Sequence, residues 1–196
     1  MKSGRMKLLP WLKPRMVPTP DRKQSALIPV KERPCGDCTA CCTIMPVSEI
    51  KKPAHEACQH LAPSGGCAIY KKRPGSCFAW SCLWVLDRSI PEELRPDRCH
   101  VIFDMMADTV TAEASDGKKT LGLTVLVAWG DPAFPDAHRA PIVRELMNEV
   151  AEKVGIPTLV RMSDEEAFAV AAPCLAGGEN WYEPPSRLEV GSQGPE

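Results

Sequence analysis

Eight of the ten cysteines in this chain lie within 48 residues, between positions 35 and 82. Such a density is far beyond what the packing of small apolar side chains needs, and it indicates either a disulfide framework or a metal site. Disulfides form in oxidising compartments, which are normally reached through a signal peptide. The apolar patch at residues 8–12 is short and interrupted by Pro10, so we expect a reducing cytoplasm, where clustered thiols bind metals.

The first four of these cysteines have the spacing of metal ligands, in the run CGDCTACC that starts at Cys35. Two thiolates separated by two residues can face one ion from a single tight turn, and Gly36 permits the backbone to fold closely around that ion. Cys41 follows at the same interval. Cys42 must point elsewhere, because adjacent side chains diverge, and it can bridge to a second site. Eight thiols would fill two four-coordinate sites.

The spacing leaves the identity of the metal open. The later cysteines follow Cys42 at intervals of 15, 8, 9 and 4 residues, so the second C-x2-C of a zinc ribbon is missing. Three thiols at x2 intervals and a distant fourth are similar to ferredoxin ligation, although the fourth lies differently here. Residues 34–98 carry few large apolar side chains, and a structural metal contributes on the order of 10 kcal/mol to the folding of such a segment.

The cysteine-rich segment resembles a known family. The opening run, Cys58, the segment CAIYKKRPGSC at residues 67–77 and Cys82 closely resemble the CxxCxxCC family of zinc- or iron-chelating proteins. Members are often labelled iron–sulfur oxidoreductases, and a related cluster occurs in flagellin lysine N-methylases. The match covers roughly residues 34–84. The resemblance implies an iron–sulfur cluster or zinc, with eight candidate ligands: Cys35, Cys38, Cys41, Cys42, Cys58, Cys67, Cys77 and Cys82.

Composition divides the chain into four parts. Residues 1–33 contain five prolines and a net charge of +7, which predicts an extended, solvated, disordered arm; the alternative is a basic arm for RNA, anionic lipid or organelle import. Residues 34–98 form the predicted cysteine-cluster module, residues 99–183 a small α+β lobe, and residues 184–196 a flexible tail. The longest apolar stretch, residues 121–129, is about half of a membrane-spanning helix, so we expect no membrane span.

The lobe has the patterns of an α+β fold. Residues 99–106, 109–114, 121–129 and 157–162 resemble strands, and Asp116-Gly117 and Ser163-Asp164 are turn signals. Residues 141–154 are typical of an amphipathic helix, with Pro141 in the first turn and Gly155 at its end. Residues 167–171 are ambiguous between strand and helix. We expect a mostly antiparallel sheet that is covered on one face by this helix.

Several residues near the cluster have two interpretations each. Cys99 is expected to be buried packing rather than a ninth ligand, and Cys174 to be structural or free. His55 and His60 flank Cys58, but eight thiols already suffice, so we expect them on the surface or beside the ligands. Tyr70 and Arg73 either donate hydrogen bonds to the cluster or anchor a turn. We expect Trp80 and Trp84 to pack in the core of the module. Ordinary positions at strand ends and turns are expected for three acidic residues, Asp104, Asp108 and Asp116.

These patterns favour three classes of function. The first is a metal-binding protein whose cluster is structural or carries electrons. The second is an iron–sulfur enzyme of the redox or methyl-transfer type, against which stand the missing glycine-rich cofactor loop and the missing acid–base pair. The third is a zinc-stabilised interaction module that recruits a protein partner through its basic arm. The formal net charge of −1 gives no reason to expect nucleic-acid binding.

Overall fold

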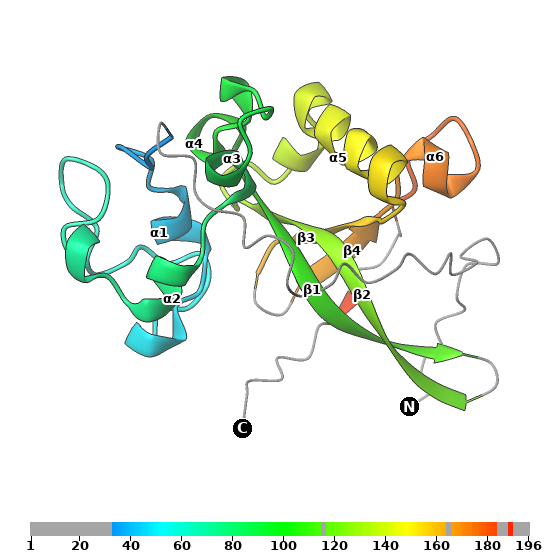
Figure 1. The fold of residues 1–196 in the computed structure, drawn as a ribbon, viewed down its shortest axis with the longest axis horizontal. Helices are drawn as coiled ribbons and strands as arrows, with labels where there is room; N and C mark the ends of the chain where they lie inside the picture. The colour runs from blue at the N-terminus through cyan, green and yellow to red at the C-terminus, as the bar shows by residue number, and fades with distance from the viewer. Residues whose placement is uncertain (1–32, 115–116, 164–165, 184–187, 190–196) are drawn as a thin grey trace.

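The computed structural model describes residues 33–114, 117–163, 166–183 and 188–189. The predicted arm lies outside the described residues apart from Arg33, as does most of the predicted tail. The fold is α+β, as the sequence predicts, with a cysteine-rich lobe of short helices beside a twisted sheet (Figure 1).

The cysteine-rich lobe is built from short helical turns. In chain order these are α1 (Ala40–Ile44), η1 (Ser48–Ile50), η2 (Tyr70–Lys72), α2 (Gly75–Ala79), α3 (Leu83–Leu86), η3 (Glu92–Leu94) and α4 (Pro96–Cys99). Proline limits several of them: Pro46 follows the end of α1, Pro74 precedes α2 and Pro96 opens α4. None of these turns exceeds five residues, so the lobe depends on contacts other than helix hydrogen bonds.

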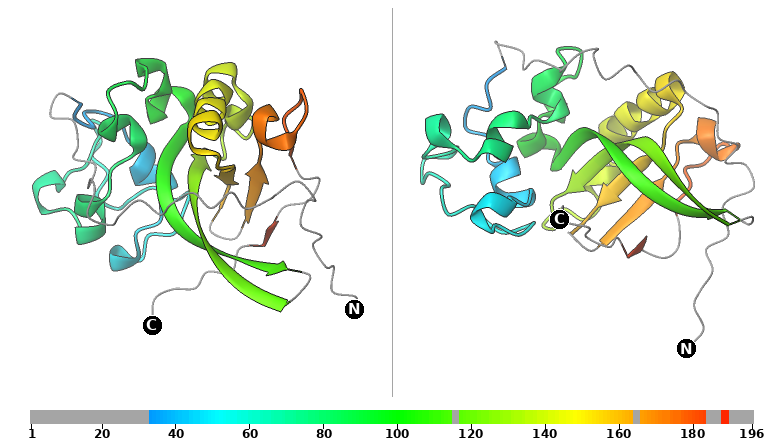
Figure 2. Two further views of the ribbon diagram at one scale, coloured as in Figure 1. Left: turned by 45° about the vertical axis from the view of Figure 1, so that its right-hand side comes forward. Right: turned by 60° about the horizontal axis from the view of Figure 1, so that its bottom comes forward.

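The sheet has five strands in the order of the chain. They are β1 (Val101–Ala114), β2 (Gly117–Gly130), β3 (Thr158–Arg161), β4 (Glu166–Val170) and β5 (Leu188–Glu189). Strands β2 and β3 are parallel and the other neighbouring pairs are antiparallel, which confirms the mostly antiparallel sheet. Strand β3 pairs with residues 126–129 of β2, so the distal part of the β1–β2 hairpin extends beyond the other strands (Figure 2).

Some predicted boundaries were wrong. Residues 99–106 and 109–114 were expected as separate strands, but β1 is continuous from Val101 to Ala114. Cys99 closes α4 rather than opening the strand, because Pro96 starts a helical turn that His100 ends with a left-handed φ of 59°. The ambiguous segment 167–171 lies almost entirely in β4. The predicted turns at Asp116 and Asp164 involve residues outside the described ranges.

Helix α5 agrees with its prediction and covers one face of the sheet. It spans Pro141–Val154, and Gly155 ends it with a left-handed φ of 74°. Val143, Leu146 and Met147 of α5 pack in one core cluster with alternate residues of the sheet, among them Leu126 and Val160. The core continues into the cysteine-rich lobe, since residues 83–99 contribute six members to the same cluster.

The opposite face of the sheet is also covered, which the sequence interpretation did not anticipate. Ala40 and Ile44 of α1 pack against Ile102, Val127 and Trp129, which face away from α5. The thiols of Cys38, Cys41 and Cys82 are partly buried against this second cluster. The cysteine-rich lobe therefore packs directly on the sheet, and this face of the sheet positions α1.

A candidate metal centre

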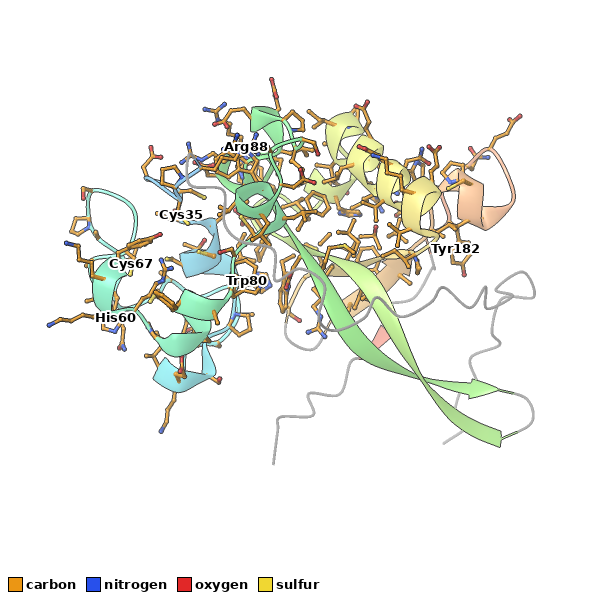
Figure 3. The ribbon with its side chains drawn as sticks, in the orientation of Figure 1. Cys35, His60, Cys67, Trp80, Arg88 and Tyr182 are labelled. Atoms are coloured by element: carbon orange, nitrogen blue, oxygen red, sulfur yellow. The ribbon has the colours of Figure 1, made fainter. Side chains whose placement is uncertain are left out.

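All eight candidate ligands line one cavity in the cysteine-rich lobe, called the cysteine cavity below. Its volume is about 490 Å³. The residues that line it come from the whole length of the lobe and from β1, which contributes Ile102. In Figure 3, Cys35, His60, Cys67 and Trp80 lie together around α1 and α2, on the side of the molecule opposite Tyr182. Residues far apart in the sequence are thus brought together around one space.

The CxxC opening of the motif forms the tight turn that its spacing predicts. The N–H of Cys38 donates to the carbonyl of Cys35 at 3.1 Å, and Gly36 has a left-handed φ of +59°. Arg95 donates to the carbonyl of Cys35 at 3.3 Å and forms an ion pair with Asp37. This turn is therefore tied to the segment that precedes α4, from which Arg95 reaches back.

The last residue of the second CxxC, Cys41, and the adjacent Cys42 lie in α1. Consecutive residues on a helix are rotated by about 100°, yet the two side chains share a hydrogen bond, so the expectation that Cys42 points elsewhere was wrong. Cys41 packs toward the sheet with Ile44, whereas the carbonyl of Cys42 accepts a hydrogen bond from the N–H of Cys58 at 2.8 Å.

The remaining cysteines reach the cavity from loops and helix ends. The N–H of Leu61 donates to Cys58 at 2.9 Å, and Leu61 forms an isolated β-bridge with Cys67. Cys77 lies in α2, and Cys82 is the residue before α3. The carboxylate of Glu49 holds α2 in place, since it accepts the N–H and the hydroxyl of Ser76 at 3.0 and 2.7 Å.

The donor set suits a thiophilic metal. All eight thiols are half-buried and none is in a disulfide. The N–H of His60 donates to Sγ of Cys58 at 3.4 Å. Within the described residues, no group of three or more Cys, His, Asp or Glu side chains stands at ligating distances. The chemistry of the residues fits zinc or an iron–sulfur cluster.

The thiols differ in how readily they lose a proton. Burial raises the pKa of Cys38, Cys77 and Cys82, the last to about 11. Cys41 and Cys42 share a hydrogen bond that raises the pKa of Cys41 and lowers that of Cys42 to about 7, and the ammonium of Lys52 also lowers the latter. A cation that binds here has to displace these protons.

Lys52 supplies a positive charge at the cysteine cavity. Its side chain is buried, and its ammonium donates to the carbonyls of Met45 and Pro53, the latter at 3.0 Å. It lines the cysteine cavity beside Cys42, where its charge offsets that of a thiolate. No local motif distinguishes this buried lysine from the adjacent, exposed Lys51.

The structure also shows where the two other cysteines and the two histidines near Cys58 lie. Cys99 is buried in the core, and its thiol lies 3.2 Å from the carbonyl of Val101; Cys174 is exposed in α6 (Pro173–Ala176). Among the described residues that line the cavity, His60 is present and His55 is not. These positions agree with a packing role for Cys99 and a free thiol at Cys174.

The aromatic residues frame the cavity. Trp80 and Trp84 both line it, and Trp84 belongs to the core. The indole N–H of Trp80 donates to Asp104 at 2.8 Å; Asp104 lies inside β1 and is buried, so its expected place at a strand end was wrong. Arg73 lies 4.2 Å from the ring centre of Tyr70 and 5.2 Å from that of Phe78. The side chain of Asp108, and Asp116 altogether, lie outside the described residues.

No family model, curated protein or solved structure matches this chain. The resemblance of residues 34–84 to the CxxCxxCC family therefore stays a prediction, and the site is argued from its own geometry. Among the described residues, no helix is long and apolar enough to cross a bilayer.

Proposed function

We propose that this chain is a metal-binding cysteine-cluster protein of the CxxCxxCC type, in which the eight thiolates hold an iron–sulfur cluster or zinc. The observation that carries the proposal is that all eight cysteines of the 48-residue cluster line the same cavity. Cys99 and Cys174, the two cysteines outside that stretch, do not line it. Soft thiolate donors select zinc and iron–sulfur clusters over magnesium or calcium.

The three thiols at x2 intervals favour an iron–sulfur cluster as the first candidate, because this spacing is similar to ferredoxin ligation. The cysteine cavity is about 490 Å³, and Trp80 and Ile102 close one side of it with apolar surface. Such surroundings limit the access of water, which is one of the properties that sets the reduction potential of a cluster.

The residues around the thiols have defined parts in the proposed function. The buried ammonium of Lys52 offsets the negative charge of the Cys42 thiolate, and the N–H of His60 donates a hydrogen bond to the sulfur of Cys58. When bound, the metal supplies cross-links between helical turns of five residues or fewer. We infer a structural contribution on the order of 10 kcal/mol, and an electron-carrying role when the group is an iron–sulfur cluster. Free thiols at this density require a reducing compartment such as the cytoplasm.

The proposal is tested by removing one thiol inside the cavity and one outside it. Cys41→Ser should lower the metal content of the purified chain and its melting temperature, because a ligand and part of the metal-linked stability are lost. Cys174→Ser is the matched control, since Cys174 is an exposed thiol in α6. Elemental analysis and thermal unfolding of both variants decide the matter. Full metal content and an unchanged melting temperature in Cys41→Ser would show that the ligand assignment is wrong.

A further inference from the structure

Two aromatic side chains are exposed on the surface of the cysteine-rich lobe: Tyr70 of η2 and Phe78 of α2. Phe78 is 73% exposed and Tyr70 is 49% exposed, the two highest values among the large apolar side chains of the described residues. Apolar rings gain free energy when they leave water, so an exposed pair on one lobe is the kind of surface at which proteins bind partners.

Arg73 joins the two rings into one patch. The carbon of its guanidinium lies 4.2 Å from the ring centre of Tyr70 and 5.2 Å from that of Phe78, in cation–π contacts that orient both rings. Its buried Nε makes no hydrogen bond to the described residues. Together with the exposed neighbours Lys71 and Lys72, these three residues are called the aromatic–basic patch below.

The patch carries positive charges that the described residues leave unpaired. Lys71, Lys72 and Arg73 are consecutive, and none of the ion pairs in the described part of the chain includes any of them. The carboxylate that contacts α2, from Glu49, accepts hydrogen bonds from the N–H and the hydroxyl of Ser76 instead. An apolar centre with a cationic rim is complementary to an apolar side chain flanked by carboxylates.

The patch forms part of the wall of the cysteine cavity. Tyr70 and Arg73 both line the cavity, and Phe78 directly follows Cys77 in α2. Figure 1 shows α2 in the cysteine-rich lobe, at the end of the molecule opposite α6. A partner bound at the patch would therefore lie beside the candidate metal centre.

Charge and geometry disfavour three other occupants of the patch. The predicted arm, residues 1–33, has a net charge of +7 and so carries the same sign as the patch. A second copy of the chain that presented its own patch would bring like charges together, which costs free energy. Single-stranded nucleic acid binds by stacking its bases on aromatic faces, but Arg73 already lies over the rings of Tyr70 and Phe78.

We propose that the aromatic–basic patch is a docking site for an acidic peptide segment of a partner protein. An aromatic or aliphatic side chain of the segment packs on the ring of Phe78, and its carboxylates pair with the ammonium groups of Lys71 and Lys72. Aromatic residues and arginine are the side chains most often found at the centre of such interfaces. This inference goes beyond metal binding and does not depend on which group the thiols hold.

The charge part of the proposal is tested with the full chain and a labelled synthetic peptide that has a central leucine flanked by glutamates, followed by fluorescence anisotropy. The acidic peptide should bind, and its affinity should fall as salt is added. A matched peptide with glutamine in place of glutamate should bind at least about tenfold more weakly. Absence of binding by the acidic peptide, or equal affinities of the two peptides, would overturn the proposal.

The place of binding is tested by one exposed phenylalanine inside the patch and one outside it. Phe78→Ala should weaken binding of the acidic peptide by about tenfold or more, because the ring is the apolar anchor. Phe134→Ala is the matched control, since Phe134 is 47% exposed and stacks on His100, and it should bind as the parent does. Equal affinities of the two variants would overturn the proposal.

Two further measurements separate this inference from the alternatives and from the proposed function. Tighter binding of a single-stranded oligonucleotide than of the acidic peptide, or a dimer in analytical ultracentrifugation that Phe78→Ala abolishes, would overturn the proposal in favour of an occupant argued against above. Phe78 is not among the described residues that line the cavity, so Phe78→Ala should keep the metal content of the parent. A parent chain without metal that still binds the acidic peptide would contradict the proposed function and leave the docking site supported.

Discussion

Arg33 is predicted to hold the beginning of the cysteine motif against the rest of the lobe. Its guanidinium donates to four carbonyls in α3 or after it: those of Trp84, Asp87, Arg88 and Ile90, at 3.0, 2.8, 3.0 and 2.9 Å. It also lies 4.9 Å from the ring centre of Trp84. Since Arg33 is two residues before Cys35, these contacts place the CxxC turn beside Cys82, which precedes α3.

The magnitude follows from the number and exposure of these bonds. Three of the four are partly buried, and a net value of about 1 kcal/mol for each gives about 3 kcal/mol for Arg33→Met, which keeps the apolar stem. The fourth bond is exposed and adds little. For a domain of about 150 residues, a loss of about 3 kcal/mol lowers the melting temperature by roughly 6–12 °C.

Thermal unfolding followed by circular dichroism measures this difference on the purified chain. Arg98→Met is the matched control: it removes the same charge, but the side chain of Arg98 is 53% exposed and pairs with Glu92 at 3.2 Å. Exposed pairs contribute between about 0.2 and 1 kcal/mol, so the control should melt within a few degrees of the parent. If Arg33→Met melted at the same temperature as Arg98→Met, the assigned role of these carbonyl contacts would be refuted.

Two further predictions concern the lobe that carries α5. Leu126→Ala should lower the free energy of unfolding by about 2–5 kcal/mol in chemical denaturation, because Leu126 of β2 is fully buried against α5. Val154→Ala is the control at an exposed position and should stay within about 0.5 kcal/mol of the parent. Equal losses in the two variants would contradict the assigned core. Burial lowers the pKa of His138 in the folded chain, and the charges of Arg139 and Arg144 lower it further against the opposing effect of Glu183. Stability should therefore be full above the unfolded value of about 6.5 and fall as the pH decreases below it, since the unfolded chain takes up the proton first. His138→Phe should reduce this decline, and an unchanged pH dependence would count against the burial argument.

The fold was predictable where a pattern was long and local. The amphipathic period of residues 141–154, with proline and glycine at its ends, predicted α5 to the residue. The start of β1 was harder to predict, because Cys99 resembles the first residue of a strand in the sequence but is the last residue of α4 in the structure. The covering of the second face of the sheet depends on contacts between α1 and residues such as Ile102, which lie about sixty positions apart and leave no local signature.

The gathering of the cysteines was predictable, whereas the surroundings of the candidate site were not. Thiol spacing and the family resemblance were enough to name eight cysteines, and the structure places all eight around one cavity. The hydrogen bond from Trp80 to Asp104 could not be predicted, since it depends on two residues that the tertiary fold brings close.

The metal content of the chain tests the central claim most directly. The chain is purified under strict anaerobiosis, its visible absorbance is recorded, and iron, zinc and acid-labile sulfide are determined per chain. The account predicts bound metal in the cysteine cavity: coloured protein with iron and sulfide for the first candidate, or colourless protein with about two zinc ions for the second. A chain that carries neither metal and whose cysteines are found as paired disulfides by mass spectrometry would contradict the account.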